Sequence, residues 1–150
     1  MIRKEVLQML ENNAKLSADE IAAKLGLSVS DVAETVAEAE AKKIVLKYKA
    51  VIDWAKLNAE KIWAFIEVKA IPHGEKGFRD IAKSIDKFPQ VNAVYLASGT
   101  YDMIILVSGE SMHDIAVFVS EKLATMDTIQ GTVTHFILKK YKEGGEIIPD

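Results

Sequence analysis

The segment from Gln90 to Val107, QVNAVYLASGTYDMIILV, decides the fold of this chain. Runs of β-branched and aromatic residues lie on both sides of Ser98, Gly99 and Asp102, which are typical turn residues. The segment therefore predicts two short strands, over residues 91–97 and 103–107, joined by a tight turn at residues 99–102.

A strand and a helix flank this pair of strands on each side. Residues 63–71 alternate in polarity as a strand does, and a turn over residues 72–77 follows them. Apolar side chains recur at helical spacing in residues 78–88 and 112–126, and residues 132–139 form a last strand. Two strand–helix–strand units joined by a turn predict a ferredoxin-like βαββαβ domain, with a four-stranded antiparallel sheet and both helices on one face.

The N-terminal part of the chain has a different pattern, which predicts three helices. The first begins near Ile2 and stops near Asn12, and a capping box from Ser17 to Glu20 opens the second, which Gly26 ends. A second box from Ser28 to Asp31 opens the third. Two capped helices separated by Gly-Leu predict a helix-turn-helix, whose second helix would enter a major groove of DNA.

The two patterns together predict an α+β chain with two domains. Residues 1–53 form the helix-turn-helix (winged-helix-like) domain, in which the β-rich residues 44–53 are expected as a strand that leads out of the domain, either alone or as part of a small wing. Residues 54–60 form a connector, and residues 61–150 form the ferredoxin-like domain, expected to sense an effector and to oligomerise. The connector is not rich in Pro, Gly or Ser.

Composition excludes several classes of protein. The 150 residues carry a formal net charge of −3 and no cysteine, which excludes disulfides and thiolate metal sites. Glu5 and Glu11 interrupt the N-terminal apolar repeat, so it is not a secretory signal, and no apolar run approaches the ~18 residues of a membrane span. We therefore expect a soluble cytoplasmic protein with no membrane partner.

Several short motifs, in this order and at this spacing, resemble the Lrp/AsnC family of transcriptional regulators over nearly the whole chain. The first three are the I-x3-VL-x2-L pattern of residues 2–10, the KLS-x3-IA-x2-LGLS block of residues 15–28, and KYKAVID with the following KLN in residues 47–58. The others are FPQV at 88–91, GTYDMIILV at 99–107, and the T-x-T of the last strand at 132–134.

The resemblance implies a function and a set of effector-binding residues. Members of the family bind DNA, pair their sheets into dimers that often assemble further into octamers, and bind an amino acid or other small effector between dimers. The residues carried over as effector-binding are Gly99, Tyr101, Asp102, Thr132 and Thr134. Turn N–H groups suit the carboxylate of an amino acid, and Asp102 suits its ammonium group. An alternative is that Gly99 and Asp102 only shape the turn.

The third helix departs from the family pattern, because acidic residues and alanines stand where arginines are typical. Carboxylates repel phosphates, so the cationic frame would have to come from neighbouring lysines. The residues expected to contact DNA are Ser28, Ser30, Glu34, Thr35, Lys42 and Lys47. The alternative is a ligand-sensing assembly partner, homologous to these regulators, that does not bind DNA on its own.

No pattern in the sequence indicates an enzyme, a cofactor or a metal site. His73, His113 and His135 lack partners at metal-ligand spacing. Ser111, His113 and Asp114 lie within one helical turn, which suits helix capping and not a catalytic triad. Sirohaem decarboxylases share this architecture, but Arg3 and Arg79 are the only arginines for a ligand with many carboxylates. A regulator is therefore preferred over this enzyme.

Overall fold

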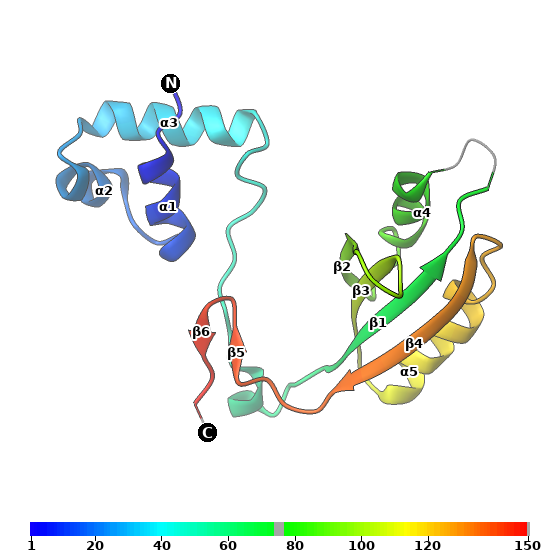
Figure 1. The fold of residues 1–150 in the computed structure, drawn as a ribbon. Helices are drawn as coiled ribbons and strands as arrows, with labels where there is room; N and C mark the ends of the chain where they lie inside the picture. The colour runs from blue at the N-terminus through cyan, green and yellow to red at the C-terminus, as the bar shows by residue number, and fades with distance from the viewer. Residues whose placement is uncertain (74–76, 150) are drawn as a thin grey trace. The chain divides into compact units, whose positions relative to one another are not determined.

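The computed structural model describes residues 1–73 and 77–149, and the chain forms two compact units, Met1–Ile52 and Asp53–Asp150 (Figure 1). Residues 74–76 of the turn expected over residues 72–77 lie outside the described part.

The first unit consists of three helices, α1 (Lys4–Asn12), α2 (Ala18–Leu25) and α3 (Val29–Ala41). Both capping residues act as the sequence predicts: Ser17 Oγ accepts the backbone N–H of Glu20 at 3.2 Å, and Ser28 Oγ accepts that of Asp31 at 3.0 Å. Gly26 ends α2 in the left-handed conformation, with φ of +64°. The helices bury Val6, Ile21, Ala22 and Val32 at their centre.

The strand expected over residues 44–53 is wrong, because no strand is assigned to these residues. The segment is exposed, and Leu46 has 83 % of its surface accessible. A β-rich composition favours an extended backbone, but a strand also needs a neighbour to exchange hydrogen bonds with. Residues 44–53 hold no Gly, Pro or Asn with which to fold back into a hairpin, so the unit supplies no such neighbour.

The second unit has the predicted ferredoxin-like order of elements, which confirms the fold class. After the 3₁₀ turn η1 (Trp54–Leu57), the elements are β1 (Ile62–Ala70), α4 (Phe78–Ile85), β2 (Val91–Leu96), β3 (Met103–Gly109), α5 (Met112–Phe118), the π-helical turn η2 (Val119–Leu123) and β4 (Ile129–Ile137). The strands form one antiparallel sheet in the order β2-β3-β1-β4.

Alternate residues of the two central strands build the core of this unit. Ala64, Ile66 and Val68 of β1 and their neighbours in β3 are fully buried, and they pack in one cluster with Ile81 and Ile85 of α4 and Ile115 and Phe118 of α5. Both helices therefore cover one face of the sheet, as the alternation in β1 predicts (Figure 1).

The structure differs from the sequence prediction at the ends of several elements. α5 ends at Phe118 and continues as the π-helical turn, where a single helix to residue 126 was expected. β4 begins at Ile129, before the expected residue 132. The tail after β4 forms a hairpin of β5 (Lys142–Glu143) and β6 (Glu146–Ile147), because Gly144 and Gly145 both adopt the positive φ of a tight hairpin turn.

Among the helices of the described residues, none has the length and apolar character that crossing a membrane requires.

Candidate functional site

The helix-turn-helix presents the outer face of α3. The inner face of this helix buries Val32, Thr35 and Ala39, whereas Ser30 and Glu34 are exposed on the other side. The prediction that Thr35 faces DNA is wrong, because only 2 % of its surface is accessible. It lies three residues after Val32, and this spacing turns it toward the core.

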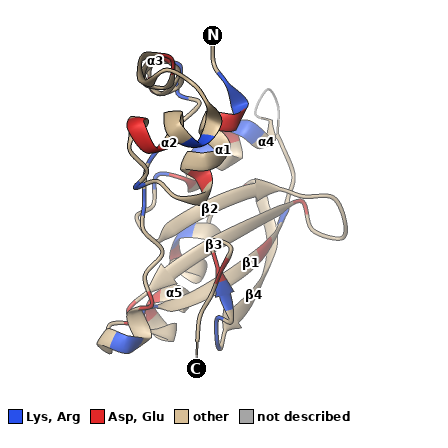
Figure 2. Ribbon diagram, turned by 90° about the vertical axis from the view of Figure 1, so that its left-hand side faces the viewer, with Lys and Arg blue, Asp and Glu red and all other residues tan. Residues whose placement is uncertain are grey.

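Charge on the first unit is balanced and not basic. Residues 1–52 carry eight Lys or Arg and eight Asp or Glu, and four of the acids lie in α3. Figure 2 colours the basic and acidic residues of the chain on the ribbon. Glu38 is already paired: its Oε1 lies 2.6 Å from Lys42 Nζ, and its Oε2 lies 3.4 Å from the N-terminal amine. The hydrogen bond from Lys42 lowers the pKa of Glu38. Of the two lysines expected to contact DNA, Lys42 is thus engaged within α3, while Lys47 lies on the exposed segment after it.

In the second unit, the turn between β2 and β3 is tied to the end of β1. The backbone N–H of Asp102 donates to the carbonyl of Val68 at 3.0 Å, and Ala97 donates to the carbonyl of Asp102 at 2.9 Å. Gly99 has φ of +130°, which a residue with a side chain rarely adopts. These bonds hold the turn in one position relative to the central strand.

The carboxylate of Asp102 is held by β1 and not by its own turn. Its Oδ2 accepts the backbone N–H of Ala70 at 3.0 Å and lies 3.3 Å from Lys69 Nζ, which also donates to the carbonyl of Thr100 at 3.3 Å. The hydrogen bond from Ala70, followed by the bond to and charge of Lys69, lowers the pKa of Asp102. The Asp102 carboxylate is therefore bound to β1, and not to the backbone of its own turn.

Lys69 is a residue of this site that sequence reasoning missed. It lies more than 30 positions before Asp102, and no periodic signal joins them. A weak signal did exist, because Lys69 is a charged residue near the end of a mainly apolar strand.

The two threonines lie on the edge strand beside this end of β1. Thr132 is opposite Val68 and Thr134 is opposite Ile66, and Val68 is also opposite Met103, which directly follows Asp102. Both threonines are half-buried on the helix-covered side of the sheet. Thus Thr132 and the Gly99–Asp102 turn lie at the same end of the sheet, on either side of β1, and Thr134 lies two residues further along β4.

Comparisons with known proteins decide the family. A model described as the Lrp/AsnC ligand binding domain matches residues 63–147, and a model described as winged helix-turn-helix DNA-binding matches residues 2–45. The HTH-type transcriptional regulator YugG of Bacillus subtilis is 41 % identical over 144 residues, which is 95 % of this chain and 87 % of that protein. The chain belongs to the Lrp/AsnC family.

Solved structures agree with this assignment. A transcriptional regulator from Neisseria meningitidis, solved as a complex with L-Met, has a TM-score of 0.74 and 26 % identity, over 93 % of this chain and 89 % of that one. An AsnC family regulator from Agrobacterium tumefaciens has the same fold, with a TM-score of 0.75 and 21 % identity, over 99 % and 97 % of the two chains. This Lrp/AsnC chain is thus a DNA-binding transcriptional regulator with a ligand-binding domain.

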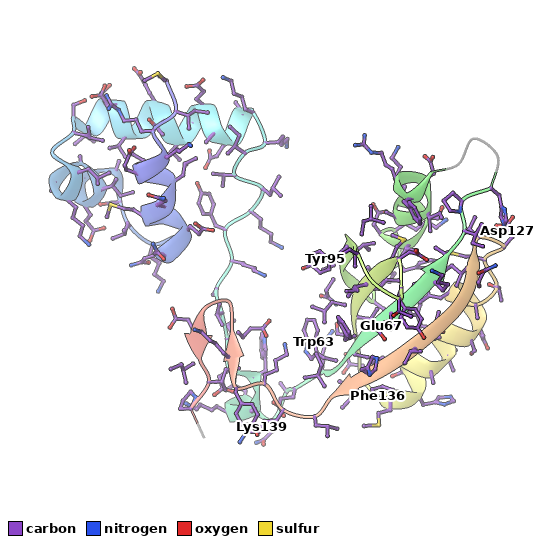
Figure 3. All side chains as sticks on the ribbon, viewed as in Figure 1. Trp63, Glu67, Tyr95, Asp127, Phe136 and Lys139 are labelled. Carbon is purple, nitrogen blue, oxygen red and sulfur yellow. The ribbon has the colours of Figure 1, made fainter. Side chains whose placement is uncertain are left out.

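The Lrp/AsnC domain also has an open sheet face, opposite the two helices. It carries the alternate residues of β1, where Phe65 is opposite Leu106 of β3 and His135 of β4, and Glu67 is opposite Ile104 of β3. Trp63 and Glu67 on β1, and Tyr95 on β2, are labelled in Figure 3. The face is mainly apolar, and its central polar contact joins His135 Nε2 to Glu67 Oε2 at 3.1 Å.

Two of the residues considered for catalysis, Ser111 and Asp114, bond to each other at the start of α5. Among the described residues, no group of three or more His, Cys, Asp or Glu is arranged to hold a metal ion. Ser111 Oγ accepts the backbone N–H of Asp114 at 3.1 Å and also contacts the Asp114 carboxylate at 2.8 Å. These bonds make Ser111 the N-cap of α5, as the sequence predicts.

Proposed function

We propose that this regulator binds an amino acid at the Gly99–Asp102 turn and, in response, changes how paired copies of α3 engage DNA. Residues 1–53 would contact DNA, residues 61–150 would bind the effector and assemble, and residues 54–60 would connect the two. It would act as a regulator and not as an enzyme, in the cytoplasm, where it meets its DNA.

The observation that carries the effector site is the pairing of opposite charges at the end of β1. A free amino acid is a zwitterion, so it needs an acceptor for its ammonium group and donors for its carboxylate. Asp102 would accept from the ammonium group, while Lys69 and the N–H groups of the turn would bind the carboxylate. Gly99 and Tyr101 would shape the turn that holds the effector. Thr132 and Thr134 would complete the wall of the effector-binding site. The Neisseria relative solved with L-Met supports an amino-acid effector.

Calorimetric titration of the full chain with the twenty amino acids tests this site, with L-Met as the first candidate. We expect one or a few to bind, and we expect Asp102→Asn and Lys69→Met each to weaken binding at least about tenfold, because each loses a charge-assisted hydrogen bond. Lys83→Met, on the exposed side of α4, is the matched control and should bind normally. If both site variants bind the amino acid as the parent does, the effector binds elsewhere on the protein.

DNA contact is proposed for Ser28, Ser30 and Glu34 at the bases and for Lys42 and Lys47 at the phosphates. Fluorescence anisotropy on DNA from the upstream region of its own gene, beside a scrambled duplex, tests it across a salt series. Lys47→Ala should weaken binding to both duplexes and reduce the steepness of log K against log salt concentration by about 1. Ser30→Ala should instead reduce the preference for the specific duplex. Lys83→Ala should change neither. If the protein does not bind either duplex at low salt, the proposed DNA contacts are wrong.

A homodimer or a larger homo-oligomer, up to an octamer, is proposed through the open sheet face. Its support is the mainly apolar character of that face, with Tyr95 57 % exposed and Val133 37 % exposed. Apolar patches of this kind on soluble proteins mark association sites. The assembly would set the spacing of two copies of α3 along DNA, since half-site spacing is geometric.

A further inference from the structure

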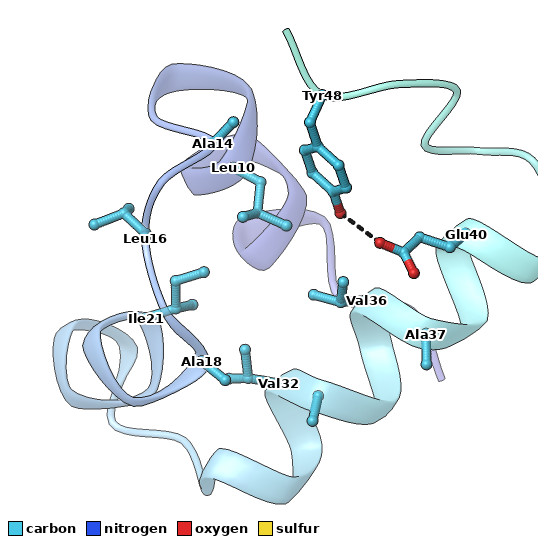
Figure 4. Close-up of a pocket in the computed structure, with 11 residues that line it drawn as sticks. Leu10, Ala14, Leu16, Ala18, Ile21, Val32, Val36, Ala37, Glu40 and Tyr48 are labelled. Atoms are coloured by element: carbon cyan, nitrogen blue, oxygen red, sulfur yellow. Dashed lines mark hydrogen bonds between the residues drawn. The ribbon is translucent and has the colours of Figure 1, made fainter. Parts of the chain in front are cut away.

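The helix-turn-helix unit contains a groove that the proposed function does not use. It has a volume of about 420 Å³ and lies between the end of α1, the start of α2 and the length of α3, with Tyr48 at one end (Figure 4). Leu10, Leu16 and Val36 form apolar walls, and Ala33 and Ala37 leave its mouth open. This volume is within the range of small-molecule sites in proteins.

One polar pair stands at the edge of this groove. The hydroxyl of Tyr48 donates to Glu40 Oε1 at 2.8 Å (Figure 4). Glu40 is the charged residue among the described residues that line the groove, and its second oxygen remains able to accept a hydrogen bond. Burial, followed by the hydrogen bond to Glu40 and its charge, raises the pKa of Tyr48, so the phenol stays protonated and neutral at physiological pH.

We propose that this groove is a second ligand site, which takes a primary amine with an apolar body about the size of a phenyl ring. The apolar body would lie against Leu10, Leu16 and Val36. The ammonium group would bind Glu40 and lie beside the ring of Tyr48, which attracts a cation through its π face.

Charge complementarity sets the specificity of this site. A carboxylate placed at the same end would be repelled by Glu40, and no lysine or arginine is among the described lining residues to compensate. The site would therefore prefer an amine to the amino acid or the acid with the same body. That preference is opposite in kind to the zwitterion recognition proposed for the Gly99–Asp102 turn.

The test compares three ligands with the same ring: 2-phenylethylamine, phenylalanine and 3-phenylpropionate. Each is titrated into the ¹⁵N-labelled full chain, and amide shifts locate the binding. We expect 2-phenylethylamine to bind with a Kd of about 1 mM and to shift the amides of Ala33, Ala37 and Tyr48, while the other two leave those amides unchanged. Equal shifts from the amine and the acid, or shifts confined to residues 99–102 and 132–134, would overturn the proposal.

Two matched pairs of variants test the residues. Glu40→Gln removes the charge but keeps an oxygen for Tyr48, so binding should weaken about tenfold, and Glu34→Gln on the same helix should bind as the parent does. Ala37→Phe fills the groove from an exposed position and should abolish the shifts, whereas Ala41→Phe should not. Undiminished binding by Glu40→Gln would overturn the proposal, as would a change of oligomer mass in Ala37→Phe, which would show that a second copy occupies the groove.

Discussion

The two faces of the four-stranded sheet are built from the same strands, yet they differ in what covers them. On β3, Ile105 is fully buried beneath α4 and α5, while its neighbour Ile104 lies on the open face in register with Glu67 and Tyr95. The covered face is buried by α4 and α5 of the same chain. The open face is comparably rich in large apolar side chains, but the described residues of the second unit place no helix over it.

This difference separates two kinds of contribution to stability. Side chains on the covered face stabilise the fold of a single chain, because they leave water when the chain folds. Side chains on the open face contribute fully only when a second copy covers them. The Gly99–Asp102 turn, where we propose that the effector binds, lies at the end of the sheet, and Asp102 bonds there to Lys69 of the open face and to the backbone N–H of Ala70.

The largest expected effect comes from substituting the neighbours Ile105 and Ile104 with alanine. Ile105→Ala should lower the free energy of unfolding by about 2–5 kcal/mol, because it leaves a cavity in the core. Ile104→Ala should lower it much less in dilute protein, with a loss that grows with protein concentration as dimers form. Urea unfolding of both variants at several concentrations measures this. Equal losses at every concentration would contradict the distinction between the faces.

A charge placed on the open face should break assembly and spare the fold. Leu106→Glu should weaken association about 100-fold, since an unpaired carboxylate in an apolar interface costs several kcal/mol. Light scattering should then show a monomer with an unchanged far-UV circular dichroism spectrum. Leu138→Glu, at a position that is 89 % exposed beyond β4, should keep the parent mass. A Leu106→Glu protein that keeps the parent mass would place the interface elsewhere.

A smaller, pH-dependent effect is expected at Asp102, whose carboxylate bonds to Lys69 and to the backbone N–H of Ala70 at the end of the sheet. Its pKa is lowered in the folded chain, so it stabilises the fold above its unfolded pKa of about 4, and this contribution disappears as pH falls through the folded pKa. Asp102→Asn should therefore have a lower Tm than the parent near pH 7, and the difference should shrink below about pH 4.

Differential scanning calorimetry from pH 3 to pH 7 measures this, with Asp127→Asn, an exposed position before β4, as the control. A difference in Tm that does not depend on pH would mean that the carboxylate charge does not stabilise the fold.

The sequence predicts what depends on short-range periodicity. The alternation of β1 and the Gly99–Asp102 turn are sufficient to predict the sheet, its two helices and the face they cover. Thr35 was misassigned because its hydroxyl suggested the polar face, although its position three residues after Val32 places it toward the core. The expected strand at residues 44–53 failed because a strand depends on a partner, which composition does not reveal. To predict the Lys69–Asp102 pair, one would need the register between β1 and β3, which no local sequence pattern gives.

The smallest expected effect concerns Glu67 and His135, the polar pair at the centre of the open face. In a single chain their side chains are 32 % and 52 % exposed, and a pair of this exposure contributes about 0.2–1 kcal/mol, because water screens it. If a second copy covers the face, the same pair loses water, and removing one partner leaves the other buried without compensation.

A double-mutant cycle of Glu67→Gln and His135→Gln should therefore give a coupling energy below about 1 kcal/mol in the monomeric Leu106→Glu background and a larger one in the assembled protein. Urea unfolding in both backgrounds provides the two values. Equal coupling energies would mean that this pair remains solvated after assembly, and the covering copy would then have to sit away from the centre of the sheet.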